Sequence, residues 1–179
     1  FVAADSGFGG RHFLLCSFIH MVFQCDNSDY RKLAEEESVR TALRATPPEP
    51  GMYAVPHCMD MKEMASEAML KKFFEGPVAY LTVRENGPPN IGKSLAQWFV
   101  YCLVIAAIAG TIARYILGAT PPSGQIACVV CTMSFLAFTG GSVQMGIWMG
   151  KPWGSVGKDA LDGLIYAAIC ALMFAVLWV

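Results

Sequence analysis

The sequence predicts an all-α integral membrane protein, a four-helix bundle with a small, mostly helical cytoplasmic segment between its first and second spans. The first observation is composition: 55% of the 179 residues are hydrophobic and 15% are charged, against about 45–50% and about 25% in average globular chains. The second is that three stretches are apolar over about 20 residues, the length that crosses a bilayer. The third is the uneven placement of Lys and Arg along the chain.

The three clearest spans are expected at residues 95–117, 126–149 and 160–179. Aromatic residues near the ends of these stretches suit the belts found at membrane interfaces. Gly and Pro follow the first two stretches and are typical helix terminators. Together the three stretches make residues 95–179 a three-helix membrane region.

Residues 1–24 are the expected fourth span. The apolar run of residues 12–23 is too short by itself, and its extension to Phe1 includes Asp5 and Arg11. An interfacial or re-entrant helix is therefore the alternative for this stretch. No cleavable signal peptide is expected, because charged residues interrupt the early apolar run.

Residues 25–94 form the polar segment. A helix is predicted over residues 34–45, because glutamates open it and arginines close it, which suits the helix dipole. The Pro-rich stretch at 46–51 is a break. A second helix is predicted to begin after Asp60, with capping-box spacing to Glu63, and to stop at Gly76. Residues 78–83 have strand character.

The distribution of basic residues predicts the orientation. Residues 24–93 contain nine Lys and Arg, and the loop at residues 150–159 adds Lys151 and Lys158, whereas the opposite side has Arg11 and Arg114. By the positive-inside rule the polar segment and this loop are expected in the cytoplasm. The net charge of -1 gives no reason to expect nucleic acid as a partner.

Few residues have the chemistry of a cofactor or metal site. His20 lies near the end of an apolar run and is a candidate axial haem ligand or proton relay, because ionisable groups inside membranes are costly. His57 and Cys58 lie among methionines, a soft ligand set that suits Cu(I) or haem iron. Hydrogen bonding for His20 and ordinary packing for the others are the simpler interpretations. No cofactor of the protein's own is therefore expected, although bound lipids are.

Small residues recur at four-residue spacing in two of the predicted spans. Ser142, Gly146 and Gly150 follow one another in this way, and so do Ala106 and Gly110. Such spacing lets a neighbouring helix approach closely in a membrane. The neighbour could be a helix of the same chain or one of a partner subunit, and the pattern alone leaves both open.

Several runs of the sequence resemble a family of small bacterial "hypothetical membrane proteins". The resemblance covers the chain from about Leu15 onward. It implies a protein of the bacterial inner membrane in which the N-terminal stretch is a continuous span. It implies no catalytic residue. The runs are SFIHM at 17–21, NSDYRKL at 27–33, GKSL at 92–95 with WFVY at 98–101, GGSVQMGIWMGKPW at 140–153 and DGLIY at 162–166.

These observations favour a non-catalytic accessory subunit of a larger membrane complex, such as an energy-transducing one. Membrane lipids and other membrane protein subunits are the expected partners. A redox, metal-handling or haem-handling membrane protein that uses His20, or His57 and Cys58, is the alternative. A small transporter is a second alternative, although Gln97, Gln144 and Asp162 are too near the interfaces to line a path.

Overall fold

The structure is a computed structural model that describes residues 29–178 of the chain. The described residues form two compact units. The helical unit comprises residues 29–31 and 90–178, and the small unit comprises residues 32–89. The helix expected within residues 1–24, with His20, lies outside the described residues and stays a prediction.

Three long helices build the helical unit: α5 (Ile91–Leu117), α6 (Ser123–Met149) and α7 (Trp153–Leu177). All three are long and apolar enough to cross a membrane, which confirms three of the predicted helices. Each begins earlier than expected. The largest difference is in α7, which was predicted from residue 160 but starts directly after Pro152. Proline is well suited to the start of a helix, so the polar first turns of α7 are helical although they are not apolar.

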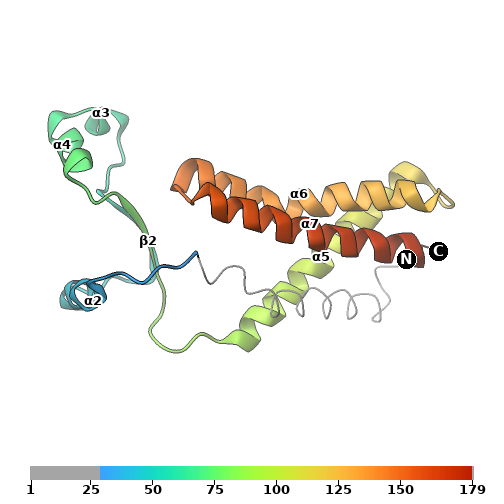
Figure 1. Ribbon diagram of the computed structural model, residues 1–179, viewed down its shortest axis with the longest axis horizontal. Helices are drawn as coiled ribbons and strands as arrows, with labels where there is room; N and C mark the ends of the chain where they lie inside the picture. The colour runs from blue at the N-terminus through green and yellow to red at the C-terminus, as the bar shows by residue number, and fades with distance from the viewer. Residues whose placement is uncertain (1–28, 179) are drawn as a thin grey trace. The chain divides into compact units, whose positions relative to one another are not determined.

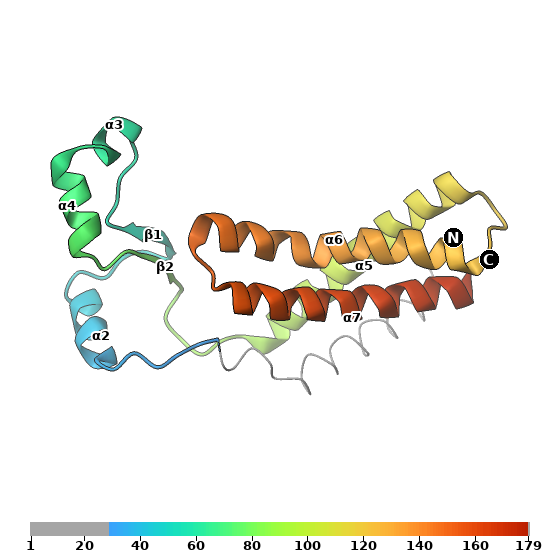
Figure 2. The ribbon, with the colours of Figure 1, turned by 45° about the horizontal axis from the view of Figure 1, so that its top comes forward.

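The helices run alternately up and down, because short connections join them. Helices α6 and α7 lie side by side along their whole length, and α5 crosses them obliquely (Figures 1 and 2). At the far end of the hairpin, Trp178 Nε1 donates a hydrogen bond of 3.2 Å to Ala119 O. The end of α7 is thereby fastened to the connection between α5 and α6.

The core of the helical unit consists mainly of small side chains around one large ring. Phe174 of α7 is 1% exposed, and a Cβ added at Gly110 of α5 would lie 2.6 Å from its Cε1 atom. The absence of a side chain at Gly110 therefore lets α5 approach α7. The core cluster is completed by residues from all three helices: Ala106, Ala109, Ala113, Ile126, Val130, Cys170 and Ala171.

Four aromatic rings join the three helices at a second point. Trp98 and Tyr101 of α5, Phe138 of α6 and Tyr166 of α7 have neighbouring ring centroids 5.6–5.9 Å apart. Most of these pairs are tilted or edge-on, the geometries that aromatic quadrupoles favour. Tyr101 also donates a hydrogen bond of 2.8 Å from its hydroxyl to Ala137 O. The cluster thus holds α5 against the α6–α7 pair by both packing and hydrogen bonding.

Helix α6 approaches α7 closely at Gly163. A Cβ added there would lie 2.3 Å from Thr139 Oγ1. Ala167 and Ala171 follow Gly163 at four-residue spacing on the same face of α7, and both are buried. This strip of small residues is the surface of α7 on which α6 packs, in the manner expected for membrane helices.

The small unit contains two strands and three short helices. Helix α2 (Glu36–Ala45) precedes strand β1 (Gly51–Val55), and helices α3 (Met61–Met64) and α4 (Glu67–Glu75) precede strand β2 (Ala79–Val83). The strands are antiparallel, with Gly51 opposite Val83 and Val55 opposite Ala79. The strand character predicted for 78–83 is confirmed by β2.

The structure corrects the expectation of a mostly helical segment in two places. Strand β1 was not expected, because the prolines of residues 46–51 indicated only a break. The single helix predicted after Asp60 is two helices, since Ser66 begins a new one by accepting a hydrogen bond of 3.2 Å from Met69 N. Asp60 is the N-cap of α3, as its position predicted, but it accepts its hydrogen bond from Lys62 N and not from Glu63 N as a capping box would. The Glu63 carboxylate instead lies beside Cys58 Sγ.

We expect Gly163→Ala to destabilise the helical unit by about 1–3 kcal/mol, as overpacking of a tight interface does. The added methyl would collide with the buried Thr139 hydroxyl. Thermal unfolding in detergent would measure the loss. Gly157→Ala is the matched control on the same helix, because an added Cβ there has open space. Equal stability of the two variants, or no recovery on adding Thr139→Ala to Gly163→Ala, would contradict the assignment.

Candidate functional site

The polar side chains of the helical unit gather where α6 turns into α7. Helix α6 ends at Gly150, whose φ of 69° is left-handed, a conformation that glycine adopts without strain. Gly150 N and Lys151 N both donate to Met145 O, which closes the helix. Pro152 then starts α7 at once, so that the connection is only three residues long. The last turns of α6 are therefore held beside the first turns of α7.

Asp159 of α7 is the centre of the first polar contact. Its Oδ2 atom accepts hydrogen bonds from Ser142 Oγ of α6 and from Lys151 Nζ of the connection. The Lys151 and Asp159 side chains are 33% and 25% exposed, so the pair is partly shielded from water. One carboxylate thus links both helices and the turn between them.

Asp29 forms the second polar contact, with Lys158 of α7, which lies 129 positions away in sequence. Its Oδ1 atom is 2.5 Å from Lys158 Nζ. The hydrogen bond from Lys158 holds the pKa of the Asp29 carboxyl below its usual value, and a hydrogen bond with Ser155 acts in the same direction. The chain that leads into the small unit is thereby fastened to the start of α7.

Each of these carboxylates is paired with an ammonium group. A general base needs a pKa near the working pH, whereas the pairing of Asp29 moves its pKa away from neutrality. The arrangement is therefore suited to fastening helix ends. We call the residues Asp29, Ser142, Lys151, Ser155, Lys158 and Asp159 the hairpin cluster.

The small residues singled out in the sequence contact helices of the same chain. Ala106 is buried in the core, and Gly110 faces Phe174. A Cβ added at Gly146 would lie 3.1 Å from Val156 Cγ2 of α7. Ser142 binds Asp159. A Cβ added at Gly150 would meet nothing within 4 Å, and the left-handed Gly150 instead terminates α6.

The soft ligand set of the small unit is not brought together around one point. His57 is exposed. Cys58 Sγ donates to Asp60 O at 3.3 Å and lies 3.7 Å from Glu63 Oε2. Partial burial, and the negative charge of Glu63 beside it, raise the pKa of the Cys58 thiol, which opposes the thiolate that a metal requires. Within the described part of the chain, no three His, Cys, Asp or Glu side chains are placed to hold a metal ion.

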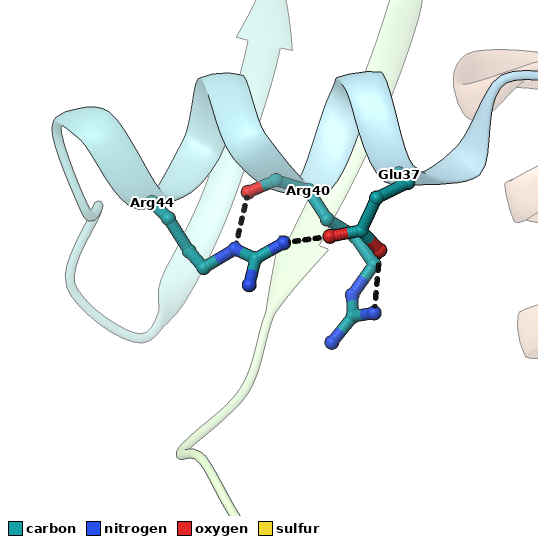
Figure 3. Close-up of polar contacts among 3 residues, drawn as sticks. All are labelled: Glu37, Arg40 and Arg44. Atoms are coloured by element: carbon teal, nitrogen blue, oxygen red, sulfur yellow. Dashed lines mark hydrogen bonds and ion pairs between the residues drawn. The ribbon is translucent and has the colours of Figure 1, made fainter.

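A group of charged side chains on α2 also lies outside the helical unit (Figure 3). Arg40 Nη1 is 2.8 Å from Glu37 Oε2, and Arg44 pairs with the other oxygen of the same carboxylate. All three side chains are more than half exposed. Exposed pairs of this kind contribute about 0–1 kcal/mol to stability. The three side chains are therefore solvated and stabilise α2 only locally.

Sequence reasoning missed the two features that organise the helical unit. The strip formed by Gly163, Ala167 and Ala171 has the same spacing that drew attention to Gly146, and the spacing could have revealed it. The contact between Asp29 and Lys158 has no sequence signal, because the two residues are 129 positions apart.

No protein-family model matches this chain, and neither the curated proteins nor the solved structures contain a significantly similar one. The resemblance to small bacterial membrane proteins therefore stays a prediction. The geometry of the chain's own residues has to carry the functional argument.

We expect Asp159→Ala to lower the stability of the α6–α7 hairpin by about 1.5–3 kcal/mol, the usual contribution of a hydrogen bond to a charged group. Two donors, Ser142 and Lys151, lose their shared acceptor. Unfolding of the purified protein in detergent would measure the change. Glu75→Ala, which removes the exposed partner of Lys71, is the control and should have little effect. Equal midpoints for both variants would refute the role of Asp159.

We expect Lys158→Ala to raise the pKa of Asp29 toward its ordinary value of 3.8. Because the folded-state pKa is lowered, the pair stabilises the protein at neutral pH and loses this effect as the pH falls through that folded-state pKa. Carboxyl NMR titration of labelled aspartates would follow the change. Lys71→Ala, which breaks an exposed ion pair in the small unit, should leave Asp29 unaltered. An unchanged Asp29 midpoint in Lys158→Ala would show that the ion pair does not form.

Proposed function

We propose that this protein is a non-catalytic accessory subunit of a larger membrane complex, and that its small unit binds another subunit. The observation that carries the proposal is the lack of a core in residues 32–89. Met69 is the one apolar residue of this unit that is buried. An independent domain of about 60 residues buries about 60% of the surface that its unfolded chain exposes. The small unit therefore lacks the interior that would stabilise it alone.

The strand pair is the part of the small unit that most needs a cover. Residues opposite each other in an antiparallel pair point to the same face. One face has Met52 and Tyr80, which are 64% and 53% exposed, and the other has Tyr53 and Leu81, which are 38% and 36% exposed. A sheet with one solvated face alternates apolar and polar residues, whereas here large apolar side chains are exposed on both faces, with Thr82 beside them on the Met52 face. A partner on these faces would bury the apolar side chains that are now exposed to water.

The outer edges of the strand pair support the same interpretation. Among the described residues, the backbone groups of β1 and β2 that point away from their pairing have no hydrogen-bond partner. Unpaired strand edges bind extended polypeptide segments by strand addition. Isolated two-stranded hairpins are at best marginally stable in water. An added strand from another subunit would stabilise the hairpin and fix its position.

The same proposal includes the membrane and the topology. It places the protein in a bacterial inner membrane as a four-helix bundle, with residues 1–24 as the fourth helix. Residues 25–94 face the cytoplasm, and so do residues 150–159, which are the connection and the first turns of α7. The positive-inside bias supports this orientation. The ion pair between Asp29 and Lys158 supports it too, since it joins the start of the polar segment to the first turns of α7.

The test is to change the β1–β2 hairpin and to follow the assembly in native membranes. Met52→Asp with Tyr80→Asp puts charge on one apolar face, so we expect the partner to dissociate. Ser38→Asp with Thr41→Asp adds the same charge to exposed polar positions of α2 and is the control. Membranes extracted into polymer-bounded nanodiscs would be sized by native mass spectrometry.

The wild-type chain and the control should appear in an assembly that contains other polypeptides, and the hairpin variant should appear as the free 19.4 kDa chain. The proposal is overturned if the wild-type chain is found alone, or if it is found only with further copies of itself. It is also overturned if the hairpin variant keeps the assembly intact.

A further inference from the structure

Helix α4 exposes an apolar edge that the small unit does not use. Met69 is buried and Phe73 is partly buried, so these two residues point into the unit. Leu70 and Phe74 are also four residues apart and therefore share a face beside the buried one. Phe74 is 90% exposed and Leu70 is 44% exposed. Helix α4 thus has one pair of apolar residues packed within the unit and a second pair that is left exposed.

The neighbouring helix α3 adds further exposed apolar side chains. Met61 is 76% exposed and Met64 is 41% exposed, and their three-residue spacing places them on one face of α3. Met59, just before this helix, is 85% exposed. Helices α3 and α4 follow each other directly in the chain and lie together (Figures 1 and 2). We call the five residues Met59, Met61, Met64, Leu70 and Phe74 the Met–Phe surface.

Both ends of the small unit are joined through few residues to the helical unit. Pro89, its last residue, is followed by Asn90, which caps α5 by accepting a hydrogen bond from Lys93 N. At the other end Asp29, three residues before Lys32, is bound to Lys158 of α7. A fully extended residue spans at most about 3.6 Å, so each end of the unit stays within about 11 Å of a helix of membrane-crossing length. Both ends of the unit are therefore tied close to the helices that lipid would surround.

The chemistry of the surface fits the interfacial zone of a bilayer. Phe, Leu and Met insert their apolar groups about 5–10 Å into the boundary between headgroups and acyl chains. Lys71 and Lys72 follow Leu70 on α4, and their long stems can cover apolar surface while the ammonium groups reach the headgroups. Residues 59–75 contain four acidic and three basic side chains. Binding should therefore depend on apolar burial and not on anionic lipid.

We propose that α4, together with α3, lies in the headgroup interface of the membrane that α5, α6 and α7 cross, with Leu70 and Phe74 inserted into lipid. This role is separate from the binding of another subunit by the strand pair. It assigns the two apolar surfaces of the small unit to different occupants, lipid for the Met–Phe surface and polypeptide for β1 and β2.

Photocrosslinking of the full chain tests the proposal directly. Phe74 would be replaced by p-benzoylphenylalanine, and the same analogue at Ala68 would serve as the matched control. Ala68 is exposed and lies on the other side of α4. The protein would be irradiated in native membranes and in vesicles of phosphatidylcholine, and adducts would be identified by mass. We expect a phosphatidylcholine adduct from position 74 in the vesicles, at least five-fold more abundant than that from position 68.

Each alternative occupant gives a different adduct. A crosslink from position 74 to a second copy of the chain, or to another polypeptide in native membranes, would overturn the proposal. So would the absence of a lipid adduct, or equal lipid adducts from both positions. The Met52→Asp and Tyr80→Asp changes should leave the lipid adduct of position 74 intact, because they affect only the strand pair. Failure of the lipid proposal is thereby distinguished from failure of the proposed function.

A second measurement checks the chemistry of binding. A fluorophore attached at Phe74→Cys, in a background whose seven native cysteines are replaced by serine or alanine, should be quenched by spin-labelled lipid. The quenching should be unchanged between low and high salt. The same label at Ala68→Cys should be quenched much less. Quenching at position 74 that disappears in high salt would show that charge holds the surface, which contradicts insertion of the apolar edge.

Discussion

The close approach of α6 to α7 at Gly163 is the constraint on which the rest of the helical unit depends. Lipid tails are as apolar as the side chains they surround, so membrane helices are held by tight packing and polar contacts. The hydroxyl of Thr139 occupies the place that a side chain at position 163 would fill. With the two backbones this close, the polar residues at the hairpin end can meet. Phe174 in turn packs against Gly110 of α5, where an added side chain would collide with its ring.

The same contact explains how the buried hydroxyl of Thr139 is tolerated. Thr139 Oγ1 is buried and has no conventional hydrogen-bond partner in the described part of the chain. An unsatisfied polar group in an apolar medium costs about 1–3 kcal/mol. The position of Thr139 Oγ1 against the Gly163 backbone allows a Cα–H···O contact, a weak bond that recurs at helix–helix interfaces. The absence of a side chain at Gly163 therefore has a polar consequence as well as a steric one.

The sequence predicted the long helices well because their signal is local. A helix of membrane-crossing length is recognised from its own apolar residues, whatever it packs against. The early start of α7 was missed because its first turns contain Gly154, Gly157 and Lys158, which are not apolar. Strand β1 was missed for a related reason. Its five residues are strand-like only once they pair with β2, and three prolines precede them.

The contacts of the candidate site were harder to predict from the sequence. Ser142 was selected as a small residue for helix packing, yet its part in the structure is to donate a hydrogen bond to Asp159. Lys151 and Lys158 were read as markers of orientation, and the structure gives each of them a specific carboxylate partner. Such pairings depend on which helix turns come together, and this is decided by packing between distant segments. Local patterns specify the elements, while the contacts between elements require the fold.

The contrast between the two units links the structure to the proposed function. In the helical unit, exposed apolar residues such as Val104 and Ile108 of α5 need no partner, because lipid covers them in a membrane. In the small unit the same degree of exposure faces water unless another surface covers it. The 58 residues of the small unit bury one apolar side chain, far less than the interior that an independent domain of this size needs. The subunit contact that we propose would supply the missing burial.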